Sequence, residues 1–456
     1  MVPPHMTDAQ AAPAARPEPT PGFRWLVLLF VSLAMFGNYY VFDALNPVGP
    51  FLESQLGFSQ AQIGALDTAY NIAAILALLA GGVVIDRAGT KRAMILFGAI
   101  TAAGGAVIAL GRVYPVMWAG RFVLGVGAEP LIVAATTVLG RWFKSKELAF
   151  AMGVNLMIAR IGSVAADNSS TLARGLFTGW QPPLLLAAAV GAVCILAGVV
   201  YALLERRAER AFALGRQGSS DRLVLADLVR FPRAYWYVVG LCVTFYSAVF
   251  PFRRFANLFF QQAHGATPQQ AGFMNSLLPW VAMFATPIFG LAVDRIGRRA
   301  LLMTVGSLAL LPCFLWMAYG RLPLPEPVAL PPGLGWFPWM WPIPAPLAIL
   351  GLSFSLVPAI MWPAVTYLVD ERRLGTAYAL MTVCQQVGWG AVVWAVGRAN
   401  DAAGASAANP AGYVPGMWIF ASLGFLGLAF SFLLWREERG PRGHGLETIR
   451  AGAAQG

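Results

Sequence analysis

The sequence predicts an all-α membrane protein whose twelve transmembrane helices form two six-helix bundles. Three observations lead to this prediction. First, the 456 residues are 58% hydrophobic and only 12% charged, whereas charged residues make up about a quarter of a soluble domain. Second, apolar runs of about 20 residues recur along the chain, and each is long enough to cross a hydrocarbon core about 30 Å thick. Third, a short loop motif occurs once in each half of the chain.

Each apolar run is interpreted as one helix, because backbone polar groups in lipid must be satisfied within the segment that crosses it. The predicted spans are 23–45, 61–85, 93–111, 115–138, 148–172, 182–204, 234–258, 269–293, 300–320, 345–368, 374–397 and 416–435. The same boundaries predict a disordered cytoplasmic tail (1–22), an N-terminal bundle (23–204), a charged cytoplasmic linker (205–233), a C-terminal bundle (234–435) and a cytoplasmic tail (436–456).

The net charge of +11 comes from an uneven distribution of Lys and Arg. Of the 32 basic residues, 24 lie in the two tails and in every second loop, four lie in the other loops and four lie inside spans. By the positive-inside rule, both termini are expected in the cytoplasm. The Ala- and Arg-rich, Lys-poor composition favours a bacterial protein and therefore the inner (plasma) membrane. The basic excess thus indicates contact with the lipid bilayer rather than with nucleic acid.

The strongest internal signal is a repeated loop. "GGVVIDRAGTKRA" follows the second span and "GLAVDRIGRRA" follows the eighth. A small residue lets two helices approach closely, and an Asp can cap a neighbouring helix. A second alignment places Arg160 opposite Gln386. Offsets near half the chain length indicate two homologous halves. The repeated positions are Gly82, Asp86 and Arg87 in the first copy and Gly290, Asp294 and Arg295 in the second.

This loop resembles motif A of the major facilitator superfamily. The resemblance implies the major facilitator fold, in which two six-helix bundles rock about a site near the midplane of the membrane. It also implies that the six repeated residues take part in gating, by helping to latch the cytoplasmic gate.

Eight ionisable residues lie inside the predicted spans, where each costs about 2.5–3.5 kcal/mol at a helix centre. Arg160 and Glu129 are near the centres of the fifth and fourth spans, whereas Asp43, Asp67, Asp167, Arg253 and Arg254 lie nearer the outer ends. The eighth residue, Arg121, lies in the segment "GRFVLGVG" of the fourth span. Two interpretations of the central residues remain open. They form an ion pair that holds two helices together, or Glu129 binds the ammonium group of a zwitterion and Arg160 binds its carboxylate through a bidentate contact.

A closer resemblance extends from about residue 35 to 400. "GRFVLGVGAEPLIVA", "WFKSKELAFAMGVNLMIARIGS" and "MWPAVTYLV" are similar to segments of lysosomal dipeptide transporters of the same superfamily. The resemblance implies that Glu129 and Arg160 hold the amino and carboxyl termini of a peptide, and Tyr70 also aligns. Side chains of the second half fall near the same level and complete the candidate substrate site: Tyr246, Asn275, Trp362 and Gln386.

The expected function is transport of small zwitterions, with dipeptides as the leading substrate, by uniport or coupled to protons. One alternative is an amino-acid carrier or an organic-anion carrier, the latter using Arg160 with Arg253 and Arg254. A non-transporting sensor is disfavoured by the two intact gating loops. An integral-membrane enzyme is disfavoured because the sequence shows no histidine cluster, nucleophile motif or phosphate-binding loop. We therefore expect no catalytic residues, no metal and no cofactor.

Overall fold

The computed structural model describes residues 19–143, 146–212, 231–331, 337–370, 373–441 and 443–448. The first half contains α1 (Pro21–Asp43), α2 (Leu45–Leu56), α3 (Gln60–Leu110), α4 (Tyr114–Trp142), α5 (Lys146–Asp167), α6 (Ser169–Leu172), the 3-10 turn η1 (Arg174–Leu176) and α7 (Gln181–Ala211). The second half contains α8 (Arg233–His264), α9 (Pro268–Ile296), α10 (Arg299–Tyr319), β1 (Glu326–Pro327), β2 (Met340–Trp341), α11 (Ala345–Leu368), α12 (Leu374–Ala402), η4 (Pro410–Tyr413) and α13 (Val414–Glu438).

Twelve helical segments among the described residues are long and apolar enough to cross a membrane, which confirms the predicted number of spans. The observed ends of several segments differ from the predicted ends of the spans. The first segment continues through α2 to Leu56, beyond a break at Ala44. The second and third spans are merged in α3 across a kink at Gly89, whose φ is 77°. The fifth span ends at Asp167, five residues before its predicted end.

The segments predicted as tails and linker are also partly helical. α1 already begins at Pro21, inside the predicted N-terminal tail. α7 continues to Ala211, so the first part of the predicted linker is helix, whereas residues 213–230 lie outside the described residues. Charged residues end a hydropathy window but are good helix formers, so the helices extend past the apolar runs.

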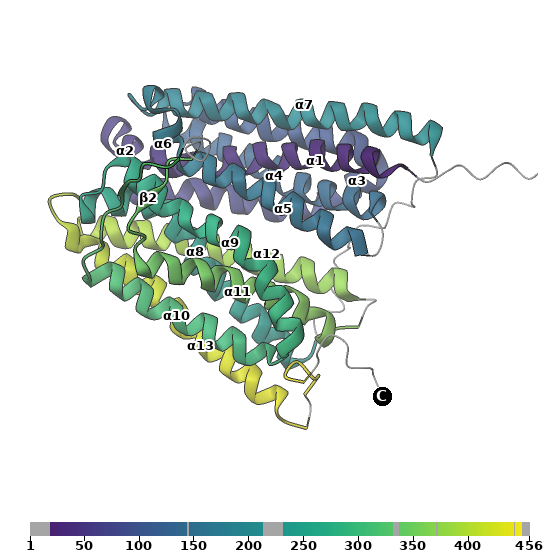
Figure 1. Ribbon diagram of the computed structural model, residues 1–456. Coiled ribbons are helices and arrows are strands. Elements are labelled where there is room, and N and C mark those ends of the chain that lie inside the picture. Colours follow the sequence, from purple (N-terminus) through teal and green to yellow (C-terminus); the bar gives the residue numbers. More distant parts are fainter. Residues whose placement is uncertain are drawn as a thin grey trace, which may run out of the picture.

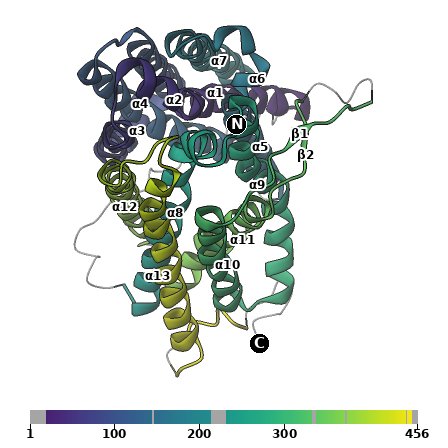
Figure 2. The same cartoon turned by 90° about the vertical axis from the view of Figure 1, so that its left-hand side faces the viewer.

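The two halves form two bundles that lie side by side (Figure 1). Across the boundary, α3 packs on α12, α5 on α9 and α2 on α8. α1 begins and α13 ends at the same end of the molecule, which we call the tail end. The opposite end carries α2, α6 and the connection from α12 to α13, and it faces the viewer in Figure 2. We call it the closed end, because the bundles are joined there by the polar contacts described below.

Small residues allow α3 and α12 to touch across the boundary. A Cβ atom added at Gly397 of α12 would lie 2.4 Å from the backbone oxygen of Gln60, at the start of α3. One added at Gly64 would lie 2.4 Å from the backbone oxygen of Val393. No Cβ fits at such distances, so this contact requires glycine on both helices. Close approach through small residues is the usual way in which membrane helices pack tightly.

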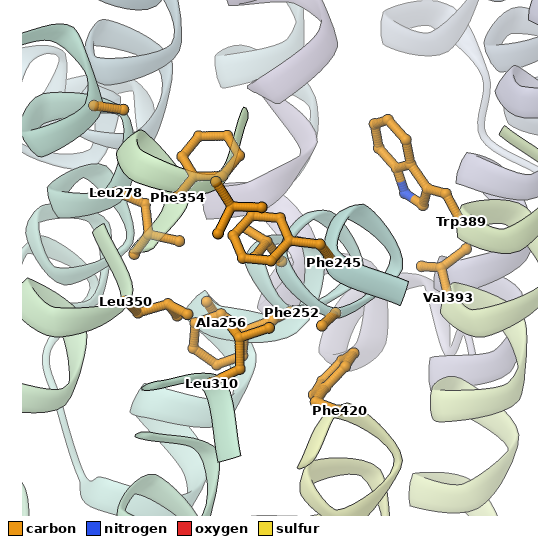
Figure 3. Close-up of a cluster of buried hydrophobic side chains, with 14 of the residues drawn as sticks. Phe245, Phe252, Ala256, Leu278, Leu310, Leu350, Phe354, Trp389, Val393 and Phe420 are labelled. Atoms are coloured by element: carbon orange, nitrogen blue, oxygen red, sulfur yellow. The ribbon is translucent and has the colours of Figure 1, made fainter. Parts of the chain in front are cut away.

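Aromatic side chains fill the core of the second half. Phe252 of α8 lies with its ring centroid 5.4 Å from that of Phe314 on α10 and 6.0 Å from that of Phe420 on α13. Figure 3 shows Phe252 and Phe420 within the wider cluster of buried side chains. Such edge-to-face contacts add about 0.5–1.5 kcal/mol each beyond the area they bury. This core holds α8, α10 and α13 together as one body.

The Pro- and Trp-rich connection between α10 and α11 folds back toward α9. Its two short strands pair antiparallel, with Glu326 opposite Trp341. The ring of Trp339 contacts Phe273 at 5.6 Å, and Phe337 contacts Trp280 at 4.8 Å. The connection is therefore anchored by aromatic contacts to one helix of the second half.

Candidate functional site

A cavity of about 460 Å³ lies between the halves, lined by α1, α3, α4 and α5 on one side and by α8, α9, α11 and α12 on the other. Ligand pockets commonly measure about 300–1,000 Å³. The structure brings six of the seven predicted substrate residues to its wall, namely Glu129, Arg160, Tyr70, Tyr246, Trp362 and Gln386. The predicted site therefore corresponds to one continuous space that both halves build.

Glu129 receives hydrogen bonds from both halves. The Tyr70 hydroxyl of α3 donates to Oε1 of Glu129 at 2.9 Å, and the Gln386 amide of α12 donates to the same oxygen at 3.2 Å. Pro130 follows Glu129 inside α4, and its missing N–H leaves one helix carbonyl without its usual partner. The carboxylate is thus fixed in position by neutral donors, and no cation pairs with it within the described residues.

Unlike the Glu129 carboxylate, the guanidinium of Arg160 is partly without hydrogen-bond partners. Its Nη1 atom is buried without a hydrogen-bond partner in the part of the chain that the structure describes. Its Cζ atom lies 5.5 Å from the ring centroid of Phe354 on α11, a cation–π contact across the boundary. The ion pair between Glu129 and Arg160, one of the two sequence interpretations, is not formed here. A buried cationic donor without a partner is costly, so the geometry favours a ligand as its counter-ion.

Aromatic side chains form much of the wall that the second half contributes. The indole N–H of Trp362 donates to the Tyr246 hydroxyl at 2.9 Å. Tyr246 stacks on Phe250 with ring centroids 5.5 Å apart, and Phe250 stacks on Trp389 at 4.4 Å. These rings come from α8, α11 and α12, so the second half contributes an aromatic surface to the cavity. The cavity wall therefore carries two carboxylates, Glu129 and Asp43, and two guanidiniums, Arg160 and Arg253, beside its aromatic rings. Asp43 and Arg253 pair with each other, so Glu129 and Arg160 are the charges available to a ligand.

Asn275, the seventh predicted residue, does not line this cavity. Its side-chain amide donates to Oδ1 of Asp167 at 2.9 Å and to the backbone oxygen of Arg253 at 3.2 Å. It is buried in a polar network between the halves, toward the closed end. The position of a residue within a span indicates its depth in the membrane but not which neighbouring helix its side chain faces. The sequence therefore did not show that Asn275 faces this network rather than the cavity.

Six ionised side chains form that network, which we call the interhalf network: Asp43, Asp67, Asp167, Arg121, Arg253 and Arg254. Arg253 Nη2 lies 2.7 Å from Asp167, and its Nη1 lies 3.3 Å from Asp43. Arg254 Nε lies 2.7 Å from Asp67, which also pairs with Arg121. Every one of these side chains is at most 6% exposed. The sequence placed the five outer residues near one end of their spans, but it did not indicate that they pair across the halves.

A cross-boundary helix cap adds to the closure. Asp401, at the end of α12, accepts hydrogen bonds from the backbone N–H groups of Gln60 and Ala61, each at 2.8 Å. These are among the free donors of the first turn of α3, which an acidic side chain satisfies well. A residue of the second half therefore caps a helix of the first half at the closed end.

The two repeated loops lie at the tail end. Gly82 and Arg87 of the first copy belong to α3, with Arg87 exposed, and the side chain of Asp86 lies outside the described residues. Gly290 of the second copy lies in α9. Asp294 is exposed and pairs with Arg299 at 3.1 Å, and Arg295 is exposed. The structure thus places both copies at the end opposite the interhalf network.

Residues 31–393 match the Major Facilitator Superfamily. The chain belongs to this superfamily. Its sequence is 30% identical to the human lysosomal dipeptide transporter MFSD1 over 87% of this chain and 85% of that protein, and 29% identical to its Danio rerio counterpart over 84% and 81%. The superfamily and these relatives make the protein a multi-pass membrane transporter rather than an enzyme, which confirms the sequence prediction.

Solved structures show the same fold. An inward-facing, unoccupied bacterial homologue of the human lysosomal transporter Spinster aligns with a TM-score of 0.69 and 18% identity, covering 92% of this chain and 98% of that one. The nucleoside transporter NupG aligns with a TM-score of 0.65 and 13% identity, covering 91% and 99%. At these identities the likeness establishes the major facilitator fold of two six-helix bundles.

Proposed function

We propose that this transporter carries dipeptides, held across the central cavity with the amino terminus on Glu129 and the carboxyl terminus on Arg160. The observation that supports this most is the buried, unpaired Nη1 of Arg160 in the same cavity as a carboxylate that no cation neutralises. A zwitterion supplies both missing charges at once. A guanidinium binds a carboxylate through two parallel hydrogen bonds, so orientation as well as charge is recognised.

The aromatic wall and the cavity volume favour a peptide over a smaller zwitterion. The wall formed by Tyr246, Phe250 and Trp389 offers apolar area to a side chain between the two termini. The organic-anion alternative loses support, because Arg253 and Arg254 already face carboxylates of the first half. A carrier of single amino acids remains the second candidate, because an amino acid presents the same two charges at a shorter separation.

We further propose that transport proceeds by alternating access and that the repeated loops around Asp86 and Asp294 serve as gates at the tail end. The Lys and Arg distribution supports an orientation with both termini and the tail end in the cytoplasm, across the plasma membrane. Proton-coupled transport and uniport are both compatible with this arrangement.

A set of matched peptides tests the proposed substrate. Binding to the purified protein is measured for one dipeptide in three forms, unmodified, amidated at the C-terminus and acetylated at the N-terminus, and for the corresponding free amino acids. Each modification removes one charge-assisted hydrogen bond worth about 1.5–3 kcal/mol, so affinity should fall roughly ten- to a hundredfold. Equal affinity for all three forms, or tighter binding of the free amino acids, would contradict the dipeptide proposal.

A further inference from the structure

The C-terminal segment 443–448 folds back onto the start of α10. Leu446 is fully buried, which anchors the segment in an apolar pocket. The buried carboxylate of Glu438, at the end of α13, accepts hydrogen bonds from the backbone N–H of His444 at 2.9 Å and of Leu446 at 3.1 Å. The His444 ring also contacts Glu438 through Nδ1 at 3.0 Å. We call residues 443–448 the strap.

The strap satisfies four backbone donors at the start of α10. The backbone oxygens of Glu447 and Leu446 accept from the N–H groups of Arg298 and Arg299 at 3.2 and 3.1 Å. The Glu447 carboxylate accepts from Ala300 at 2.9 Å and from Leu301 at 3.2 Å. A carboxylate at a helix N-terminus satisfies free N–H groups and interacts favourably with the helix dipole. Arg298, the residue at the cap position, offers no side-chain cap of its own.

The loop that the strap holds has an unusual backbone. Arg298 has a φ of 49°, in the left-handed region that non-glycine residues seldom adopt, and the preceding Gly297 has a φ of 69°. Glycine adopts a positive φ readily, whereas Arg298 pays a cost for it, and such a conformation at a non-glycine residue persists only where surrounding contacts impose it. The strap supplies these contacts directly beside Asp294 and Arg299, which pair within the second repeated loop. The position of the strap and the shape of this loop are therefore linked.

The first repeated loop is held by the corresponding part of the other half. Thr90 accepts a hydrogen bond from the Tyr201 hydroxyl at 3.0 Å, and Lys91 pairs with Glu209. Tyr201 and Glu209 belong to α7, the last span of the first half, just as the strap follows α13, the last span of the second. In the first half the brace is a continuous helix. In the second half the corresponding contacts come from a short non-helical segment, the strap.

We propose that the strap positions the second gating loop, with Glu447 as its positioning residue, and that its docking favours the conformation seen here. This inference rests on the proposed gating role of the loop around Asp294. Detachment of the strap would free the start of α10 and the loop, and it would shift the population toward the opposite conformation. The C-terminal tail is thus assigned a regulatory role in transport.

Four variants test the inference. Glu447→Ala removes the cap, whereas Glu447→Gln keeps a side-chain oxygen that can accept the same bonds. A chain that ends after Gly440 lacks the strap, and a chain that ends after Thr448 retains it as the matched control. Hydrogen exchange at residues 298–301 reports docking. Spin labels at positions 207 and 370, on the tail-end sides of the two halves, report the distance between the bundles without any added substrate.

Glu447→Ala and the shorter chain should speed exchange at residues 298–301 and reduce the population with the present distance. The ratio of the two populations should change about two- to thirtyfold, the range that loss of one helix cap covers. The chain ending at Thr448 should behave like the unmodified protein, and Glu447→Gln, which keeps an acceptor oxygen but loses the charge, should change both readouts less than Glu447→Ala. Faster exchange with unchanged distances would overturn the positioning role, and unchanged exchange would overturn docking itself.

A further variant separates this inference from the gating proposal on which it rests. If neither strap removal nor Asp294→Asn changes the distances between the bundles, the assignment of the gating loop is wrong. If Asp294→Asn changes the distances while strap removal does not, the failure lies in the strap. Neither result depends on the identity of the substrate, because none is added.

Discussion

At the scale of single residues, Glu129 and Arg160 are two opposite charges on the wall of the central cavity that the protein keeps apart. Glu129 is held by the neutral donors of Tyr70 and Gln386, and Arg160 retains a buried unpaired nitrogen. An internal ion pair would neutralise both groups and leave nothing for a ligand to satisfy. Keeping them separate costs stability in the empty protein, and under the proposed binding mode a zwitterion would recover that stability.

Replacement of Arg160 by Lys tests the geometry of the carboxylate contact. The substitution keeps the positive charge but replaces a planar two-point donor with a single ammonium group. We expect the affinity for an unmodified dipeptide to fall about ten- to a hundredfold, and the preference over the C-amidated form to be largely lost. Calorimetric titration measures both. Retention of full affinity by the Lys variant would exclude a bidentate contact.

Glu129→Gln tests the other end of the ligand. The amide preserves size and can still accept from Tyr70, so the fold should remain intact. Affinity for the free amine should decrease about ten- to a hundredfold, while affinity for the N-acetylated peptide should change little. A thermal-shift series with both peptides measures the difference. A uniform loss for both peptides would indicate a structural role for Glu129 instead.

At the scale of helices, the closed end is held by a backbone contact and by buried charges. The contact between α3 and α12 has no room for a Cβ at Gly397. Beside it, the interhalf network and the Asp401 cap join side chains of both halves. These interactions all require the two bundles to be close, so each of them stabilises the present conformation selectively.

Gly397→Ala should open the closed end. The added methyl group would meet the backbone of Gln60 and Ala61, which cannot move away without separating α12 from α3. Gly140→Ala is the matched control, because a Cβ there meets nothing within 4 Å. Spin labels at the exposed positions 172 and 407 should report longer distances for the Gly397 variant alone. An equal response of both variants would attribute the effect to helix propensity.

Arg253→Met should destabilise the present conformation strongly, because it leaves Asp43 and Asp167 buried without their shared cation. Removing one partner of a buried ion pair costs about 3–5 kcal/mol. Adding Asp43→Asn and Asp167→Asn should restore much of the thermal stability, since neutral amides need no counter-ion. If the triple variant melts no higher than Arg253→Met, the charge explanation is wrong.

At the scale of the whole molecule, the sequence predicted the number of spans, the two halves and the superfamily. Length and hydropathy determine spans, and the repeated loops around Asp86 and Asp294 reveal the duplication. The sequence did not predict that Asn275 belongs to the interhalf network or that Arg253 pairs with Asp167, because these contacts depend on how two separate bundles face one another. It also did not indicate that Leu446 and Glu447 bind α10, since a short charged tail carries no periodic signal.

The orientation of the molecule can be tested by labelling. The expected topology places Arg207 on the cytoplasmic side and Ala407 on the outer side, and both positions are exposed. A cysteine at 407 should react with an impermeant maleimide in intact cells, whereas one at 207 should react only after permeabilisation. The native cysteines are buried or half-buried, so background labelling should be low. Reaction of both positions in intact cells would refute the topology.

If the bundles separate at the closed end, each of the two surfaces exposed by the separation carries a net charge. Three carboxylates and one guanidinium of the interhalf network belong to the first half, and two guanidiniums belong to the second. The network is neutral as a whole, but its parts carry about two negative and two positive charges. As the gap widens, the two oppositely charged surfaces attract each other across water. Dissolved ions screen this attraction over a Debye length of about 8 Å at physiological salt and about 3 Å at 1 M. Higher ionic strength on that side of the membrane should therefore slow reclosure there, and transport should respond differently to salt added on its two sides.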